Sequence, residues 1–282
     1  WRVSHVVTLN NFNVAAMRKR LQSASHPGEL SEEELREGLR RRVRDFNDWA
    51  CALYRREPRV VPFVMADPVL FGADEAAAEV ERCFAQGAQG VKIHPDTCGH
   101  YPADARALPI YEVCASRGMP VITDTNGVAG TGGECFGAPS GWRPVLEQFP
   151  SLNLVLAHMP GERWDEHLEL AREFGDNLHF DTSPGFVDAR HPAEQHRSLP
   201  ATEAARVMRS IGVDRILFGS DAPTRGREIP DAVQQILGLG LRDDELEGIL
   251  AGNAARLLNI ADRCTPADQG GAGGNAGGRD GF

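Results

Sequence analysis

The sequence predicts an α/β fold built on a parallel β-sheet. Short apolar runs recur along the chain, and most are continuously apolar rather than alternating, as in strands buried on both faces. Amphipathic segments of helical length separate these runs almost throughout. Such strand–helix alternation is typical of βαβ units, whose strands run parallel.

The candidate strands are rich in Val, Ile, Leu and Phe, and they cover Ser4–Leu9, Val60–Ala66, Gly90–His94, Pro120–Thr125, Asn153–His158, Leu178–Thr182 and Arg215–Asp221. The helical candidates cover Glu32–Tyr54, Asp74–Ala85, Ala103–Ser116, Gly141–Phe149, Glu162–Phe174, Ala201–Ile211, Ile229–Leu237, Asp243–Leu250 and Ala254–Ile260. Ser31, followed three residues later by Glu34, forms a capping-box pattern before the longest helix. Gly118 and Gly175 are typical helix stops.

About seven βα units fit this pattern, and two architectures use such units. An open doubly wound sheet needs no further unit, whereas a (β/α)8 barrel needs one more. In a barrel we expect the extra unit to precede Trp1, because the chain starts with Trp rather than Met. Residues 264–282 contain seven glycines in nineteen residues and no apolar periodicity. We therefore predict one domain over residues 1–262 and a disordered tail over 263–282.

Composition favours a protein of the cytoplasm that acts on small molecules. The formal charge of −10 argues against nucleic acid or an anionic membrane as a partner, and no apolar run reaches the length of a membrane span. The basic cluster at residues 36–44 is interleaved with acids, which is typical of a solvated helix face. The six cysteines are scattered without a CxxC pair, so we expect them to be mostly reduced. Assembly into a homo-oligomer stays open.

Nearly every candidate strand ends in a polar or ionisable residue. These residues are Asp67, His94, Asp124, His158, Asp181 and Asp221. The C-terminal ends of parallel strands share one edge of the sheet, where α/β folds bind their ligands. A rim of imidazoles and carboxylates suits a divalent metal, and it also suits general acid–base chemistry.

Taken singly, each of these residues has a simpler interpretation. Asp67 precedes a proline and fits turn chemistry, and the stretch 181–183 (DTS) fits a helix cap or a group that orients a neighbour. The glycine-rich stretch 127–133 has no P-loop lysine, so we interpret it as an active-site lid. The sequence contains no HxH pair, no HExxH and no GxSxG. The ensemble of strand ends is what favours a functional site.

The motifs at these strand ends resemble the amidohydrolase superfamily, in particular its aminocarboxymuconate-semialdehyde decarboxylase-like branch. The matching pieces are FVMADP at 63–68, GVKIHP at 90–95, PVITDTN at 120–126, LVLAHMPG at 154–161, LHFDTS at 178–183, ILFGSDAP at 216–223 and ILAGNAARLL at 249–258. The resemblance implies a TIM-type (β/α)8 barrel, here lacking its first βα unit, with divalent metal at the strand C-terminal ends.

The resemblance also implies roles for individual residues. Asp221 matches the acid of strand 8, which binds the metal and takes a proton from metal-bound water. His158 matches the histidine of strand 6, which polarises the substrate or shuttles a proton. The family's HxH pair is absent from this sequence, and Asp124 replaces its strand 5 histidine. We expect Asp221, Asp124 and His158 to hold the metal, either zinc or, alternatively, manganese. Some relatives use the carboxylate directly as a base without metal, and Asp124 and Asp221 fit that version too.

The resulting prediction is a metal-dependent hydrolase in which activated water attacks a carbonyl of a small carboxylated or cyclic substrate. Lys92, His94 and Arg225 are the candidates for binding an anionic group of the substrate, although salt bridges or a solvated loop would equally explain the lysine and the arginine. Two alternatives stay open: a nonoxidative decarboxylase with the same metal site, and a truncated or degenerate barrel without activity.

Overall fold

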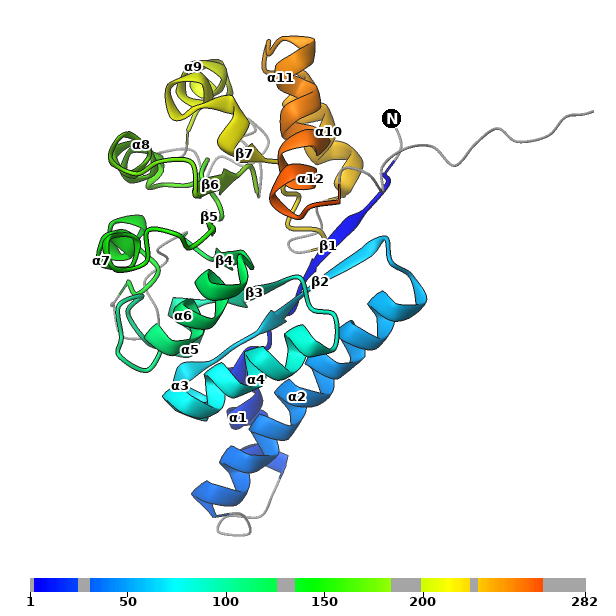
Figure 1. Cartoon of the computed structure of the whole chain (residues 1–282), viewed down its shortest axis with the longest axis vertical. Coiled ribbons are helices and arrows are strands. Elements are labelled where there is room, and N and C mark those ends of the chain that lie inside the picture. Colours follow the sequence, from blue (N-terminus) through cyan, green and yellow to red (C-terminus); the bar gives the residue numbers. More distant parts are fainter. Residues whose placement is uncertain (1–2, 25–30, 126–134, 184–198, 224–227, 261–282) are drawn as a thin grey trace, which may run out of the picture.

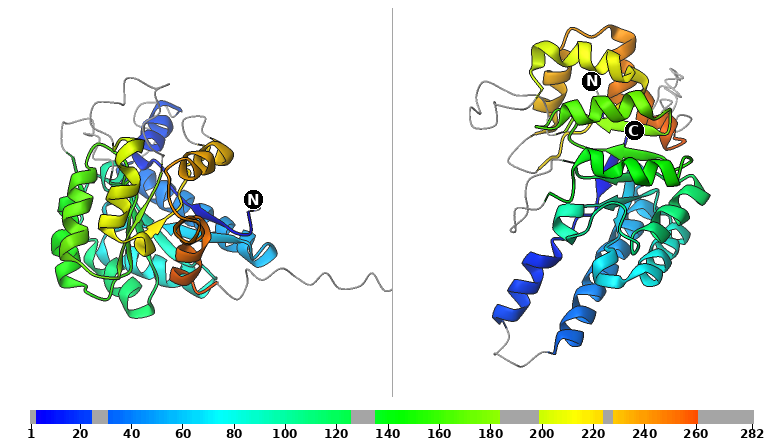
Figure 2. Two further views of the ribbon diagram at one scale, coloured as in Figure 1. Left: turned by 90° about the horizontal axis from the view of Figure 1, so that it is seen from above. Right: turned by 90° about the vertical axis from the view of Figure 1, so that its left-hand side faces the viewer.

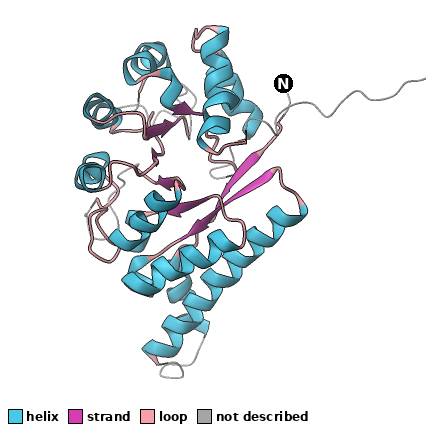
Figure 3. Cartoon of the chain, viewed as in Figure 1, coloured by secondary structure: helices cyan, strands magenta, loops and turns pink. Residues whose placement is uncertain are grey.

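The computed structural model describes residues 3–24, 31–125, 135–183, 199–223 and 228–260. Its seven strands form one parallel sheet whose spatial order is the sequence order, and in the described part no pairing joins β7 back to β1. The strands are β1 (Val6–Leu9), β2 (Val60–Met65), β3 (Gly90–Ile93), β4 (Val121–Thr123), β5 (Leu154–Leu156), β6 (Leu178–Asp181) and β7 (Ile216–Leu217). The sheet is curled, with helices along its outer side (Figures 1 and 3). This is the α/β architecture of the barrel type that the sequence predicts.

The helices follow the strands as expected for βαβ units. They are α1 (Val14–Ala24), α2 (Glu32–Arg56), α3 (Pro68–Phe71), α4 (Ala73–Ala85), α5 (Pro95–Cys98), α6 (Leu108–Arg117), α7 (Arg143–Gln148), α8 (Trp164–Glu173), α9 (Ala201–Ile211), α10 (Ile229–Leu237), α11 (Asp243–Glu247) and α12 (Asn253–Leu257). Figure 2 shows α1 and the first half of α2 projecting beyond the sheet. The capping box before α2 is confirmed, because the Ser31 hydroxyl accepts from the Glu34 amide and the Glu34 carboxylate accepts from the Ser31 amide.

Two apolar clusters lie on the two faces of the sheet. The larger cluster fills the space between the sheet and the helices, and β3 contributes Val91 and Ile93 to it. The smaller cluster lies on the inner face, where Phe63 of β2 and Ile122 of β4 are buried. Since successive side chains of a strand point to opposite faces, Lys92, which is paired in register with Met65 and Ile122, points inward.

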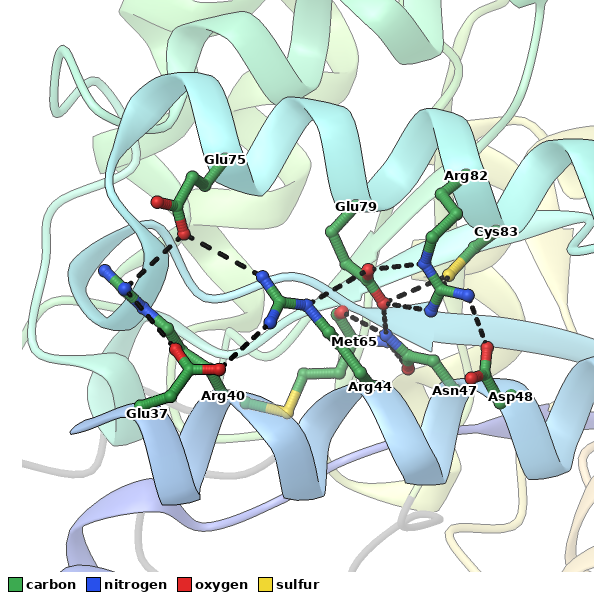
Figure 4. A network of polar contacts seen from close by, with 10 residues as sticks. All are labelled: Glu37, Arg40, Arg44, Asn47, Asp48, Met65, Glu75, Glu79, Arg82 and Cys83. Atoms are coloured by element: carbon green, nitrogen blue, oxygen red, sulfur yellow. Dashed lines mark hydrogen bonds and ion pairs between the residues drawn. The ribbon is translucent and has the colours of Figure 1, made fainter. Parts of the chain in front are cut away.

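A polar network fixes α2 and α4 to the sheet (Figure 4). Asn47 of α2 is fully buried and donates to the Met65 carbonyl and to the Glu79 carboxylate, while its oxygen accepts from the Met65 amide. Arg82 donates two further hydrogen bonds to Glu79 at 2.8 Å. The buried Glu79 charge is therefore paired, and the C-terminal end of β2 is held in place.

The elements differ from the sequence prediction mainly at their ends. Helices α9 and α10 have the predicted bounds, whereas most strands are shorter than predicted. Strand β1 begins two residues later, and the predicted polar ends His94, Asp124 and His158 lie beyond the last residues of their strands. Helix α1 was not predicted at all. The five described cysteines are free thiols, in line with the expectation of a mostly reduced chain. No helix among the described residues has the length and apolarity required to cross a bilayer.

Candidate active site

His158 lies at the centre of a hydrogen-bonded group formed by the ends of three neighbouring strands. Its ring Nε2 is 2.7 Å from Asp124 Oδ2, and its ring Nδ1 is 3.0 Å from Ser183 Oγ. Asp124 follows β4, His158 follows β5, and Ser183 follows β6. The predicted meeting of strand-end residues at one rim is thus confirmed for these strands. All three side chains are buried.

Asp181, the last residue of β6, organises this group. Its Oδ1 accepts from the main-chain N–H of His158 at 2.9 Å, from the main-chain N–H of Ser183 at 2.9 Å and from the Ser183 hydroxyl at 2.7 Å. The alternative that Asp181 orients a neighbour is confirmed. His158 itself has a left-handed backbone with φ 68°, which is uncommon for a residue other than glycine.

Burial and ion pairing shift the pKa values of His158 and Asp124 in opposite directions. Burial, the largest effect, lowers the pKa of His158, but the hydrogen bond and charge of Asp124 and the charge of Asp181 raise it, and the net pKa lies above the usual value. Burial likewise raises the pKa of Asp124, but His158, His94 and Lys92 together bring it well below its usual range. Both shifts favour the charged forms of the pair, an imidazolium and a carboxylate.

Asp221 reaches the same rim from β7 but makes no hydrogen bond or ion pair to the described residues. Its backbone is left-handed with φ 53°, and the following Ala222–Pro223 peptide is cis. Burial raises the pKa of its carboxyl, the charge of His158 lowers it, and the net pKa is above the usual value. A partly buried carboxylate with a raised pKa is suited to accept a proton.

Two further residues face this rim: Lys92 of β3 and His94, which directly follows that strand. The His94 Nε2 lies 3.7 Å from Asp124 Oδ2, and burial lowers the pKa of its ring. Lys92 is only 5% exposed, and its charge acts on Asp124, His158 and Asp221. Within the described part of the chain, its ammonium has no hydrogen-bond or ion-pair partner.

The other sequence-predicted residues lie elsewhere. The turn interpretation of Asp67 is confirmed, because its Oδ1 accepts from the Val69 and Leu70 amides at the start of α3. Arg225 and the glycine-rich stretch 127–133 lie outside the described residues, as does the tail 263–282. Ser183 was predicted only within the stretch 181–183, as a helix cap or a group that orients a neighbour, and not as a contact of His158.

The donor set does not fit a metal ion as it stands. Among the described residues, no group of three or more His, Cys, Asp and Glu side chains could hold a cation. The two donors in contact, Asp124 and His158, are hydrogen-bonded to each other at 2.7 Å, and a protonated Nε2 has no lone pair for a metal. The metal implied by the resemblance, zinc or manganese, therefore stays a prediction, which elemental analysis of the purified protein would test.

The amidohydrolase family profile matches residues 24–260. The chain belongs to the amidohydrolase family. The resemblance seen in the strand-end motifs is thereby confirmed over most of the chain. A comparison with the curated proteins found no match.

Solved structures of similar fold include a TIM-barrel protein and two decarboxylases. An uncharacterised TIM-barrel protein of Bordetella bronchiseptica is 27% identical, with TM-score 0.62 over 77% of this chain and 73% of that one. A 2,6-dihydroxybenzoate decarboxylase from Rhizobium is 18% identical, with TM-score 0.62 over 80% and 79%. A dihydroxybenzoic acid decarboxylase from Polaromonas, solved with manganese and 2-nitroresorcinol, is 17% identical, with TM-score 0.57 over 80% and 77%. At these low identities, the two decarboxylases establish only the shared fold.

Proposed function

We propose that the chain is a hydrolase that cleaves an ester, lactone or amide bond of a small carboxylated substrate. The observation that carries this proposal is the buried His158–Asp124 pair, which lies on the same rim as the carboxylate of Asp221. In this proposal the imidazolium form of His158, which Asp124 favours, is the positive charge, and Asp221 is the base. These are the two groups that addition of water to a carbonyl requires.

Each residue has one role in this reaction. Asp221 accepts a proton from water while the water oxygen forms a bond to the carbonyl carbon. The His158 imidazolium, held by Asp124, stabilises the negative charge that develops on the carbonyl oxygen. When the tetrahedral adduct collapses, the bond to the leaving group breaks and Asp221 returns the proton to that group.

Lys92 and His94 are proposed to bind an anionic group of the substrate, and Lys92 supplies the stronger argument. Lys92 is only 5% exposed, so water would weakly screen the attraction between its ammonium and a substrate carboxylate placed beside it. Benzoate and its neutral analogue benzamide test this role by calorimetric titration. Benzoate should bind better than benzamide, and Lys92→Met should abolish the difference while Lys19→Met, on the exposed face of α1, preserves it. If Lys92→Met bound benzoate as tightly as the unmodified protein does, this role of Lys92 would be contradicted.

Nonoxidative decarboxylation is the second candidate. It is favoured by two structural neighbours, a 2,6-dihydroxybenzoate decarboxylase and a 5-carboxyvanillate decarboxylase, and by the positive charge of the largely buried Lys92. In this version His158 would protonate the carbon from which carbon dioxide departs.

A substrate panel tests the proposed function. Lactones, esters, amides and hydroxybenzoates are offered to the purified protein, and both acid release and carbon dioxide release are recorded. Hydrolysis should fall about 100- to 10,000-fold in Asp221→Asn, the usual share of a general base. Asp214→Asn, an exposed carboxylate just before β7, is the matched control and should retain activity. Full activity in Asp221→Asn, or carbon dioxide as the product, would refute the proposal that the chain is a hydrolase with Asp221 as its base.

A further inference from the structure

The loop after β6 holds His158 both by its backbone and by its ring. The main-chain N–H of His158 donates to Asp181 Oδ1 at 2.9 Å, and the ring Nδ1 lies 3.0 Å from the Ser183 hydroxyl oxygen. That hydroxyl in turn lies 2.7 Å from the same Asp181 oxygen. Asp181 Oδ1 therefore holds the backbone of His158 directly and the ring of His158 through the Ser183 hydroxyl.

The direction of each hydrogen bond follows from the donors available. Asp181 Oδ1 already receives two main-chain N–H groups, so this oxygen carries no proton and can only accept. The Ser183 hydroxyl must then donate its single hydrogen to Asp181. Its remaining lone pairs can only accept, so the hydrogen between Ser183 and His158 belongs to ring Nδ1. The Ser183 carbonyl, 3.3 Å from Nδ1, accepts from the same side.

This chain of hydrogen bonds has little freedom to rearrange. A Cβ added at Gly219, just after β7, would lie 3.1 Å from both Asp181 Oδ2 and Ser183 Cβ, so the two side chains are packed against that segment. The intervening Thr182 is tied to Gly219 by hydrogen bonds in both directions. The left-handed backbone of His158, φ 68°, is strained for a histidine, and the bond from its N–H to Asp181 keeps it in place.

We infer that Ser183 is a positioning residue for His158. Its hydroxyl, which donates to Asp181, accepts a hydrogen bond from Nδ1–H and thereby directs Nε2 toward Asp124 and the rim. A histidine ring has two distinct nitrogens, and the partner of one determines what the other can do. This inference rests on the proposed function for its catalytic meaning. The ring orientation itself can be measured without any turnover.

The test is nuclear magnetic resonance of the histidine ring hydrogens at one fixed pH. The Nδ1–H signal of His158 is assigned by its loss in His158→Gln. In the unmodified protein this hydrogen should exchange slowly with water. In Ser183→Ala, its exchange should accelerate about tenfold or more, as expected for the loss of one buried hydrogen bond. Ser183→Thr, which keeps the hydroxyl, should restore slow exchange.

Thr182→Val is the matched control, because it removes the adjacent buried hydroxyl, which does not contact His158. This variant should leave the Nδ1–H exchange unchanged. Equal exchange in Ser183→Ala and the unmodified protein would overturn the inference, and so would equal acceleration in Thr182→Val. Either result would leave hydrolysis by the substrate panel unaffected, so the failure of this inference and the failure of the proposed function are separate outcomes.

Discussion

Asp124→Asn tests the charge of the buried pair with almost no change of shape. Asp124 is 7% exposed and His158 is 6% exposed, so neither charge has much contact with water. Removing one partner of a buried ion pair costs about 3–5 kcal/mol, because the other charge stays buried and uncompensated. His158 can escape this penalty only by losing its proton, and the penalty should therefore depend on pH.

The sign follows from the pKa of His158, which is raised in the folded protein. A raised histidine pKa adds stability that is fully present below the unfolded value of about 6.5 and is lost as pH rises through the folded value. In Asp124→Asn burial dominates and lowers that pKa, so the unfolded chain binds the proton more readily. We expect destabilisation of about 3–5 kcal/mol at pH 5.5. At pH 9 the loss should be at most about 2 kcal/mol, the range for one weakened hydrogen bond.

Urea unfolding followed by circular dichroism at the two pH values measures this difference. Asp244→Asn is the control, because its side chain is 72% exposed and water screens its pair with Arg242, so the variant should unfold almost like the unmodified protein at either pH. The same loss of unfolding free energy at both pH values in Asp124→Asn would refute the reasoning, because it would mean that His158 carries no pH-dependent charge in the fold.

Three further variants test the framework around the site, all by the free energy of unfolding in urea. Asn47→Ala leaves the buried amide and carbonyl of Met65 without a partner and should cost about 2–6 kcal/mol, at about 1–3 for each group; a loss below 1 kcal/mol would contradict the role of the network. Asp67→Ala removes the cap of α3 and should cost about 1–2 kcal/mol, and no change would show that the cap is dispensable. Gly90→Ala places a Cβ 2.3 Å from the Phe63 ring and should cost about 1–3 kcal/mol, whereas a neutral result would mean that the inner face is loosely packed.

The sequence predicts the sheet well because buried parallel strands leave a strong local signal. Apolar runs bounded by polar residues fix where each strand lies, and a capping box fixes where α2 begins. The strand ends are less predictable, since a turned backbone such as that of His158 is set by its partner in the next strand. Helix α1 was missed, although Val14, Met17 and Leu21 have the spacing of one helix face and pack against the core.

The candidate site was predictable as a place but not as a set of contacts. Polar residues at the ends of parallel strands must share one rim, which brings Asp124 and His158 together. Which atoms meet depends on register and on side-chain direction, so the direct bond between these two residues could not be read from spacing. Ser183 was predicted only as part of the stretch 181–183, because serine is common after strands and only the position of Asp181 gives its hydroxyl a direction.

The fate of solvent oxygen tests the central claim, hydrolysis, most directly. The substrate identified by the panel is turned over in water labelled with oxygen-18, with deuterium oxide in a parallel reaction, and the products are analysed by mass spectrometry. The proposed function predicts one labelled oxygen in the product acid and no deuterium bound to carbon. A product without labelled oxygen, carrying deuterium on carbon and formed together with carbon dioxide, would contradict it.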